Sequence, residues 1–292
     1  MNDIRLGDVT ISAILEHQKY GMKPEDLFLG SDTETIRRHA AGMEPFLFDP
    51  ETGRITLAFQ SFLIRTPSKI ILVDTCNGAD KMTDAVTWDT QPWLDRFHEL
   101  GLTLEDVDYV LCTHLHIDHT GWNTRLEKGR WVPTFPKATY LFDRGEYAYW
   151  QDVSRTGIVP PRQREEVWRI NCLPVAEAGQ AVLVDGAYRL DEHVSIVPTP
   201  GHSPGHYCVR LQSRGFEAIV LGDLAHHKLQ CCEPDWSTPF CHDPAMAAKS
   251  RRKLFCEAVD SGALLLPTHF PSPTAGRLSA RGEAFQFDFL AD

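Results

Sequence analysis

One short stretch, Thr113–Gly121, places three histidines and an aspartate within six positions, directly after an apolar run. A single histidine is most often a surface residue or a hydrogen-bonded core residue, because imidazole coordinates a cation only where other ligands converge. Four candidate ligands in one stretch reverse that expectation. The stretch therefore predicts a metal site, and the rest of the chain must fold so that further ligands reach it.

The spacing within this stretch suits more than one metal ion. His114 and His116 alternate as residues of an extended segment do, so both imidazoles can lie on one side. A turn after them then brings Asp118 and His119 toward the same point. An ionised carboxylate can bridge or hold a hard or borderline cation, whereas neutral imidazole suits zinc, iron, nickel or copper.

The pattern His-x-His-x-Asp-His resembles that of the metallo-β-lactamase-fold superfamily of metallohydrolases. Three later motifs extend the resemblance in the family's order. Thr199–His206 is similar to the second histidine loop, Leu221–Asp223 to the strand end with the bridging aspartate, and Pro267–Phe270 to the last ligand segment. The resemblance covers residues 63–270 and implies an α/β fold, a four-layer αββα sandwich with its metals at one edge between the sheets.

The resemblance also implies a ligand set for two divalent metal ions, zinc first, with iron, manganese or cobalt as alternatives. The implied ligands are His114, His116 and His202 for one metal, Asp118, His119 and His269 for the other, and Asp223 as the bridge. In the family's second loop the histidine directly after Pro-Gly coordinates. This favours His202 over His206, which we interpret as structural.

The chemistry that such a site implies is hydrolysis. Two cations that share a water can lower its pKa from about 15.7 toward 7, which supplies hydroxide at neutral pH without a protein base. One metal polarises the carbonyl or phosphoryl oxygen, and the other can hold the departing oxyanion. We interpret Asp118 as a catalytic candidate as well as a ligand, because a carboxylate there could orient the nucleophile or return a proton.

The motif order and Asp223 resemble most closely the group of N-acyl homoserine lactonases, methyl-parathion-hydrolase-like phosphotriesterases and small-ester hydrolases. Zinc β-lactamases with a cysteine ligand carry that cysteine at the position of Asp223. The lactonases usually place a tyrosine three residues after the bridging aspartate, where it helps to polarise the lactone carbonyl. Here that position is His226. Two roles stay open for His226, a catalytic donor to the substrate oxygen or a support for the ligands.

Composition limits the partners. The formal net charge of -11 argues against a nucleic-acid partner, because phosphate binding needs a clustered positive field. No apolar run is long enough to span a membrane, and the start of the chain lacks the basic and apolar regions of a signal peptide. We expect a cytoplasmic protein with a small-molecule substrate, no nucleic-acid or membrane partner, and a homodimer as one option.

The eight cysteines follow no framework spacing, so in a reducing compartment they should remain thiols. Cys231, Cys232 and Cys241 leave two readings open, a soft-metal site or, as we favour, small buried or loop thiols.

The length of 292 residues is compatible with a single domain over residues 1–292. Within it, residues 20–50 are punctuated by glycine and proline, which predicts a loop with short helical pieces and a candidate lid. Alternating and β-branched runs predict strands at 9–15, 55–65, 70–74, 107–112, 138–142, 180–184, 194–198, 207–211, 217–221 and 264–266. Helices are expected at 93–100, 146–153 and 243–260.

Aromatic residues near the predicted metal edge together indicate an apolar pocket, although each one taken alone more often belongs to the core. They are Phe28, Phe48, Trp88, Trp122, Phe135, Trp150 and Trp236. The main hypothesis is a dinuclear metal hydrolase that uses a metal-bridging hydroxide to open small, mostly apolar lactones or esters. The alternatives are a phosphotriester or aryl-halide hydrolase on the same site and, in another class, an iron-dependent redox or dioxygenase protein.

Overall fold

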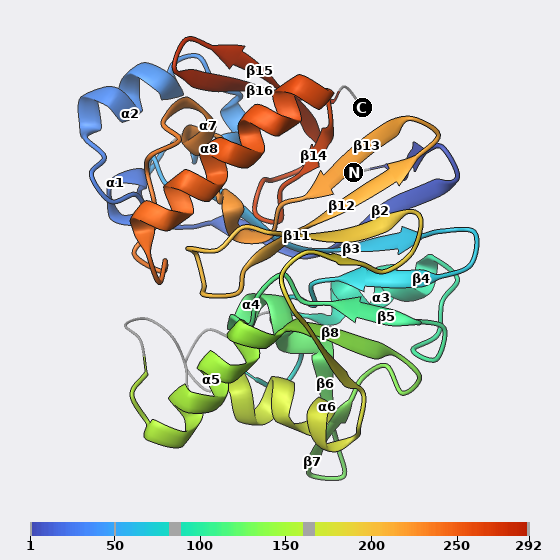
Figure 1. Ribbon diagram of the computed structural model, residues 1–292. Coiled ribbons are helices and arrows are strands. Elements are labelled where there is room, and N and C mark those ends of the chain that lie inside the picture. Colours follow the sequence, from blue (N-terminus) through green and yellow to red (C-terminus); the bar gives the residue numbers. More distant parts are fainter. Residues whose placement is uncertain (1, 50, 82–88, 160–166, 291–292) are drawn as a thin grey trace.

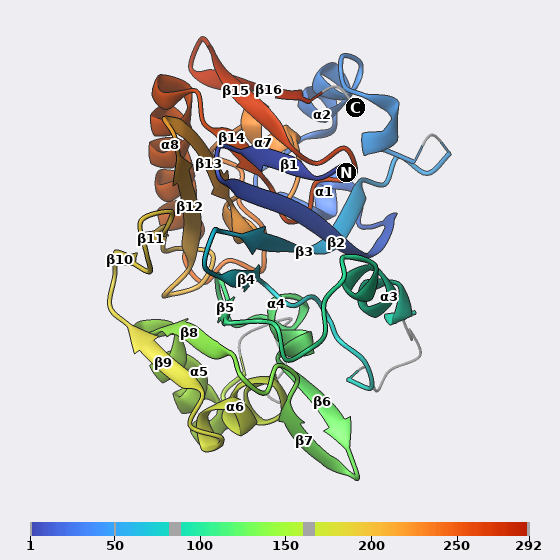
Figure 2. The ribbon, with the colours of Figure 1, turned by 90° about the vertical axis from the view of Figure 1, so that its right-hand side faces the viewer.

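Two seven-stranded β-sheets pack face to face, and helices cover the outer face of each sheet (Figures 1 and 2). This arrangement is seen in a computed structural model that describes residues 2–49, 51–81, 89–159 and 167–290. Of the aromatic residues named above, Trp88 lies outside the described residues. The four layers confirm the αββα sandwich that the motifs predicted.

The first sheet combines an antiparallel half with a parallel half. In sheet order its strands are β1 (Ile4–Leu6), β2 (Val9–Tyr20), β3 (Thr56–Arg65), β4 (Ile70–Val73), β5 (Tyr109–Leu111), β8 (Thr139–Asp143) and β9 (Ala181–Val184). Strands β1 to β4 pair antiparallel, whereas β4, β5, β8 and β9 pair parallel. The strands predicted at 55–65 and 70–74 are confirmed as β3 and β4, which pair as a hairpin.

The second sheet comes almost entirely from the C-terminal part of the chain. Its strands are β10 (Tyr188–Arg189), β11 (Val194–Pro198), β12 (Tyr207–Ser213), β13 (Phe216–Val220), β14 (Leu264–Leu266), β15 (Gly276–Arg281) and β16 (Ala284–Phe289). Only β13 and β14 pair parallel among these neighbours. A separate hairpin consists of β6 (Thr124–Glu127) and β7 (Arg130–Pro133).

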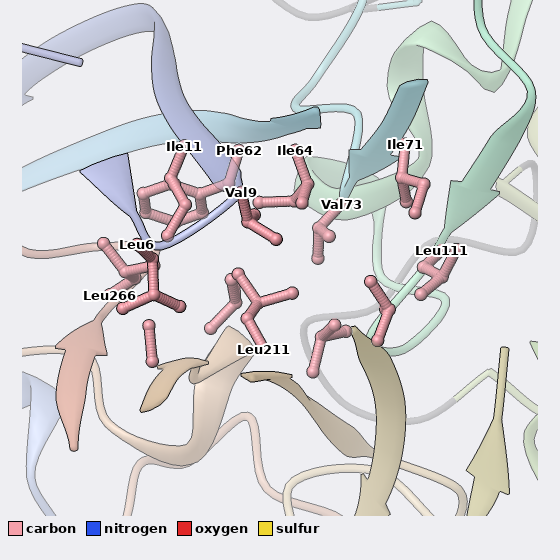
Figure 3. Close-up of a cluster of buried hydrophobic side chains, with 14 of the residues drawn as sticks. Leu6, Val9, Ile11, Phe62, Ile64, Ile71, Val73, Leu111, Leu211 and Leu266 are labelled. Atoms are coloured by element: carbon pink, nitrogen blue, oxygen red, sulfur yellow. The ribbon is translucent and has the colours of Figure 1, made fainter. Parts of the chain in front are cut away.

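The core between the sheets is built by residues that alternate along the strands. Figure 3 shows Ile11, Phe62 and Val73 of the first sheet pointing toward the face of the second sheet that carries Leu211 and Leu266. All five side chains are buried. Full burial of a side chain of this size contributes roughly 1.5–3 kcal/mol. This shared core fixes the position of one sheet relative to the other.

The outer helices pack through one apolar face each. Around the first sheet these are α3 (Gln91–Glu99), α5 (Arg144–Thr156) and α6 (Leu173–Glu177), and around the second α7 (Leu229–Cys232) and α8 (Pro244–Ser261). The side chain of Asp243 accepts a hydrogen bond from Met246 N and caps α8, and Gly262 ends it with a φ of 66°. The sequence predicted this helix at 243–260. Among the described residues, no helix has the length and apolar character needed to cross a bilayer.

The described part of the candidate lid, residues 20–49, contains α1 (Pro24–Leu27), α2 (Thr33–Ala40) and the short turn η1 (Pro45–Leu47). Short helical pieces in a long connection are what the sequence predicted. Leu27 and Ile36 pack with Leu229 and Trp236 in a small apolar cluster. The segment is therefore joined to the loop that follows Asp223.

A β-bulge in β2 turns one carboxylate inward. Leu15 pairs with Gln60 and His17 pairs with Phe59, so Glu16 is the extra residue between them. Its buried carboxylate accepts hydrogen bonds from Asn77 N and Nδ2, Gly78 N and Trp122 Nε1. These bonds hold the loop after β4 against the segment after the metal motif.

The two segments touch through their backbones. A Cβ on Gly121 would lie 1.8 Å from the carbonyl carbon of Asn77, a distance that no side chain can occupy. Overpacking usually costs about 1–3 kcal/mol. We therefore expect Gly121→Ala to lower the free energy of unfolding by about that amount or more. Urea denaturation of the metal-free protein measures this value.

Gly42→Ala is the matched control, because Gly42 is exposed and a Cβ there meets only His39 O at 3.9 Å. This control should change the unfolding free energy by no more than about 0.5 kcal/mol. Equal unfolding free energies for the two variants would contradict the close backbone contact.

Candidate metal centre

Each candidate ligand lies just beyond the end of a strand. His114 and His116 follow β5, and the one-turn helix α4 (Ile117–Thr120) then carries Asp118 and His119. In the second sheet, His202 follows β11, Asp223 follows β13 in the turn η4 (Gly222–Leu224), and His269 follows β14. These ends meet at one edge of the sandwich, so residues far apart in sequence converge there.

The structure brings all seven predicted ligands together in two groups. One group is His114, His116, His202 and Asp223, and the other is Asp118, His119 and His269. Within each group the candidate ligand atoms lie within 4.8 Å of one another. All seven side chains are buried except that of Asp118, which is partly exposed.

Asp223 lies at the centre of both groups. Its Oδ1 is 3.0 Å from His119 Nε2 and 2.9 Å from His269 Nε2. Its Oδ2 is 3.1 Å from His202 Nε2 and 3.7 Å from His114 Nε2. One carboxylate therefore faces imidazoles of both groups, which is the geometry that a bridging ligand requires.

Several buried atoms of the cluster have no hydrogen-bond partner among the described residues. They include His114 Nε2, His119 Nε2 and Asp223 Oδ1. A buried polar atom without a partner is costly, and a bound cation would satisfy these atoms. His202 Nε2 also lies 3.0 Å from His116 Nδ1, so two nitrogens that can each offer a lone pair converge. The donor set thus fits divalent metal ions that accept nitrogen and oxygen ligands.

The Nδ1 atoms of His119 and His269 are both hydrogen-bonded, which leaves their Nε2 atoms available as ligands. Asp74 Oδ2 accepts from His119 Nδ1 at 2.8 Å, and the Asp74 carboxylate also accepts from Thr113 N and Oγ1. The carbonyl oxygen of Ala58 accepts from His269 Nδ1 at 2.8 Å. In both histidines the Nε2 lone pair then points into the cluster. The bond from Asp74 therefore fixes the orientation of the His119 ring.

Electrostatics divide the imidazoles into two kinds in the metal-free chain. Burial and the neighbouring imidazoles hold the pKa values of His114 and His116 well below the usual value, and burial lowers the pKa of His202 to about 3. For His119 and His269 burial acts in the same direction and is the largest single effect, but the neighbouring carboxylates, Asp223 first and Asp118 with it, together outweigh burial and raise both pKa values. Metal binding would therefore release protons mainly from the second pair.

The two further histidines near Asp223 differ in their contacts. Both ring nitrogens of His206 are engaged, Nε2 by the backbone N–H of Asp223 and Nδ1 by Thr199. This geometry favours His202 over His206 as a ligand. His226 Nε2 lies 3.1 Å from Asp223 Oδ2, and its ring stacks on that of His269 at 5.6 Å. His226 thus reaches the cluster from the cavity side.

A cavity of about 440 Å³ opens onto the cluster. Beside His116, Asp118, Asp223, His226 and His269, it is lined by Met22, Leu27, Leu57, Phe59 and Phe240. Lys19 also lines it, and burial lowers the pKa of its ammonium group to about 8. The cavity is mainly apolar, as the sequence predicted.

The aromatic residues that the sequence nominated for this cavity are mostly elsewhere. Phe28, Trp122, Phe135, Trp150 and Trp236 are buried and Phe48 is half-buried, and none of these six lines the main cavity. Trp122 stacks on Trp93 in the core of the first sheet, which makes that expectation wrong for it. Trp150 lines a smaller cavity of about 240 Å³ that also reaches His116 and His202.

The lining residues Phe59 and Phe240 were missed. For Phe59 a signal existed, because Leu57 and Phe59 alternate on one face of β3. All eight cysteines are free, and none belongs to a candidate metal group among the described residues. Cys241 Sγ lies 3.5 Å from His202 Nδ1, so it contacts the cluster from behind.

The sequence relatives of the chain include N-acyl homoserine lactonases. The N-acyl homoserine lactonase AttM of Agrobacterium fabrum is 26% identical over 242 residues, which span 73% of this chain and 82% of that protein. The N-acyl homoserine lactonase AiiA of Bacillus thuringiensis subsp. kurstaki is 26% identical over 156 residues, 53% of this chain and 52% of the relative.

Solved structures share the fold. The hydrolase AbOPH of the beta-lactamase superfamily superimposes with a TM-score of 0.84 at 23% identity, over 99% of this chain and 97% of that one. AidC, a dizinc quorum-quenching lactonase in complex with the product N-hexanoyl-L-homoserine, gives 0.83 at 20% identity over 100% and 97%. The family model of the metallo-beta-lactamase superfamily matches residues 60–280. The chain therefore belongs to the metallo-beta-lactamase superfamily and is a metal-dependent hydrolase.

Proposed function

We propose that the protein is a dinuclear metal hydrolase that opens small, mostly apolar lactones or esters. The observation that carries this proposal is the convergence of seven candidate ligands at the base of a mainly apolar cavity. The lactonase relatives support it as well, since the named activity of AttM is that of an N-acyl homoserine lactonase.

We assign His114, His116 and His202 to one metal, Asp118, His119 and His269 to the second, and Asp223 to both. When bound, the metals would supply a water of lowered pKa and polarise the carbonyl oxygen of the substrate. Asp74 and the carbonyl oxygen of Ala58 hold His119 and His269 in the tautomers that such binding needs.

Asp118 is proposed to act on protons as well as to bind metal. It is the one candidate ligand with appreciable exposure, and it lines the cavity beside His269, whose Nε2 is 3.6 Å from Asp118 Oδ2. A carboxylate in that position can orient the attacking water and return a proton to the leaving oxygen.

His226 is proposed to donate a hydrogen bond to the carbonyl oxygen of the substrate. The ring lines the cavity, and neither ring nitrogen has a hydrogen-bond partner among the described residues. A donor that faces the reacting group is worth most where water is excluded, because charge develops there in the transition state.

Zinc is the proposed native ion, since imidazole and carboxylate ligands suit it.

We also propose a cytoplasmic location, a single domain in which the 20–50 segment acts as a lid over the cavity, and a homodimer as one assembly. The net charge of -11 supports the exclusion of nucleic acids as partners.

His116→Ala should reduce the metal content from two ions per chain to one and lower turnover at least about 100-fold, because a lost ligand should cost no less than a lost supporting residue. Metal analysis after gel filtration and the rate of ester hydrolysis measure the two effects. His39→Ala is the control, because His39 bonds to Glu233 away from the cluster. Unchanged turnover of the His116→Ala variant at full metal occupancy would refute the site. Redox-active iron in the wild-type protein, together with oxygen uptake, would favour the dioxygenase alternative.

His226→Phe should lower kcat on lactones by about 100-fold to 1,000-fold, the usual cost of one donor to a developing oxyanion, with metal content unchanged. His226→Tyr should restore part of the rate, since a phenol O–H can also donate. A His226→Phe variant that loses metal instead of rate would make His226 a support for the ligands.

A homologous series of lactones and esters tests the substrate class. Each methylene that enters the apolar cavity contributes about 0.8 kcal/mol, so kcat/KM should rise about fourfold per methylene until the cavity is filled. Phosphotriesters and aryl halides belong in the same panel of substrates. Inactivity on every lactone and carboxylic ester would contradict the proposed function, and turnover of phosphotriesters or aryl halides alone would favour the alternative.

A further inference from the structure

The three-histidine half of the centre depends on two loops from different sheets. His114 and His116 lie in the loop after β5 of the first sheet, whereas His202 lies in the loop after β11 of the second. A fixed distance between the two loops is therefore a condition for binding one cation. One buried carboxylate, that of Glu146 in the first turn of α5, lies between them.

Glu146 accepts hydrogen bonds from both loops. Its Oε1 accepts from Leu115 N at 3.0 Å, and Leu115 is the residue between His114 and His116. Its Oε2 accepts from Gly205 N at 2.9 Å, three residues after His202. The two oxygens of one carboxylate thus join the two ligand loops through their backbones.

The neighbours of Glu146 strengthen this junction. Trp150, one turn further along α5, donates from Nε1 to Glu146 Oε1 at 2.9 Å and packs edge-on against His116, with ring centroids 5.8 Å apart. A Cβ on Gly205 would lie 2.1 Å from Asp143 Oδ1 and 2.7 Å from the Cβ of Glu146. The second loop therefore lies directly against the start of α5, where only glycine fits.

The hydrogen bonds to Glu146 come from neutral N–H groups. Both carboxylate oxygens of Glu146 accept hydrogen bonds from N–H donors. Because an ionised carboxylate can only accept hydrogen bonds, the ionised form of Glu146 suits this environment. Burial raises the pKa of Glu146, and the bonds from Gly205 and Leu115 oppose that rise.

The other half of the centre is anchored by carboxylates other than Glu146. Asp74 holds His119, and Glu16 holds the Asn77–Gly78 backbone on which the segment after α4 rests. Among the described residues, Glu146 forms no hydrogen bond with any of these groups. Loss of Glu146 should therefore act on one half of the centre and spare the other.

We propose that Glu146 is the positioning residue of the three-histidine metal site, and that it sets the affinity of this site by holding the His114–His116 and His202 loops at a fixed separation. The proposal rests on the ligand assignment of the proposed function. It adds a residue that touches neither metal nor substrate.

Glu146→Gln tests the proposal with little change in volume. The amide can still accept from Leu115 and Trp150, but its NH₂ group then faces the N–H of Gly205, so the bond to the second loop is lost. Loss of a residue that orients metal ligands typically costs 10-fold to 100-fold in affinity. We expect the dissociation constant of the three-histidine site to rise at least about tenfold, and that of the other site less than about threefold.

Cadmium-113 NMR during chelator titration measures both sites in one sample. His202→Ala and His269→Ala assign the two signals, and Glu16→Gln is the matched control, a buried carboxylate expected to weaken the second site instead. Equal weakening of both sites by Glu146→Gln, or no weakening of either, would overturn the proposal. If the Gln variant fails to fold, Glu146→Asp, which keeps the charge and shortens the reach, is judged by the same criteria.

The same titration separates the two levels of inference. A wild-type protein with a single cadmium signal would contradict the dinuclear assignment. The role of Glu146 would then still be decided by whether the signal that His202→Ala removes is the one that Glu146→Gln weakens.

Discussion

The structure depends on a cluster of buried imidazoles gathered around one carboxylate. Asp223 is 4% exposed, and four ring nitrogens lie within 3.1 Å of its oxygens. The imidazoles hold the pKa of Asp223 well below its usual value against the opposing effect of burial. Removing such groups from water is costly unless each finds a partner. The ligand cluster is therefore stable only where a cation or protons balance it.

The sandwich satisfies that requirement by anchoring each ligand loop to something rigid. The backbone of His269 is paired with β3, because Ala58 N donates to His269 O and Ala58 O accepts from its ring. Asp74, held in the left-handed region at a φ of 57°, directs its carboxylate to His119. The strands thus contribute more than apolar burial, since their ends determine which nitrogen of each histidine faces the centre.

The histidine-rich stretch after β5 and the strands that carry the candidate ligands were predicted because both depend on local spacing, whereas His202, Asp223 and His269 were nominated by the resemblance to the superfamily. Residues such as Asp243 and Gly262 also act locally, and the helix that they bound was predicted within a few residues. The inward turn of Glu16 could not be predicted, because it requires a bulge against β3. Trp122 was assigned to the pocket for a similar reason, since its partners Trp93 and Glu16 are distant in sequence. Strands β15 and β16 were missed altogether.

The candidate metal ligands and the wall of the substrate cavity come from different elements of the fold. The ligands lie on short loops that the two sheets and α5 hold from behind, so a change there disturbs several buried polar groups at once. The cavity wall comes from other elements, with Phe59 on β3, Leu27 on α1 and Phe240 in the loop before α8. Apolar walls of this kind tolerate substitutions of similar volume. The metal chemistry can therefore stay constant while the cavity wall changes, and this is why the motifs indicate the reaction more firmly than the substrate.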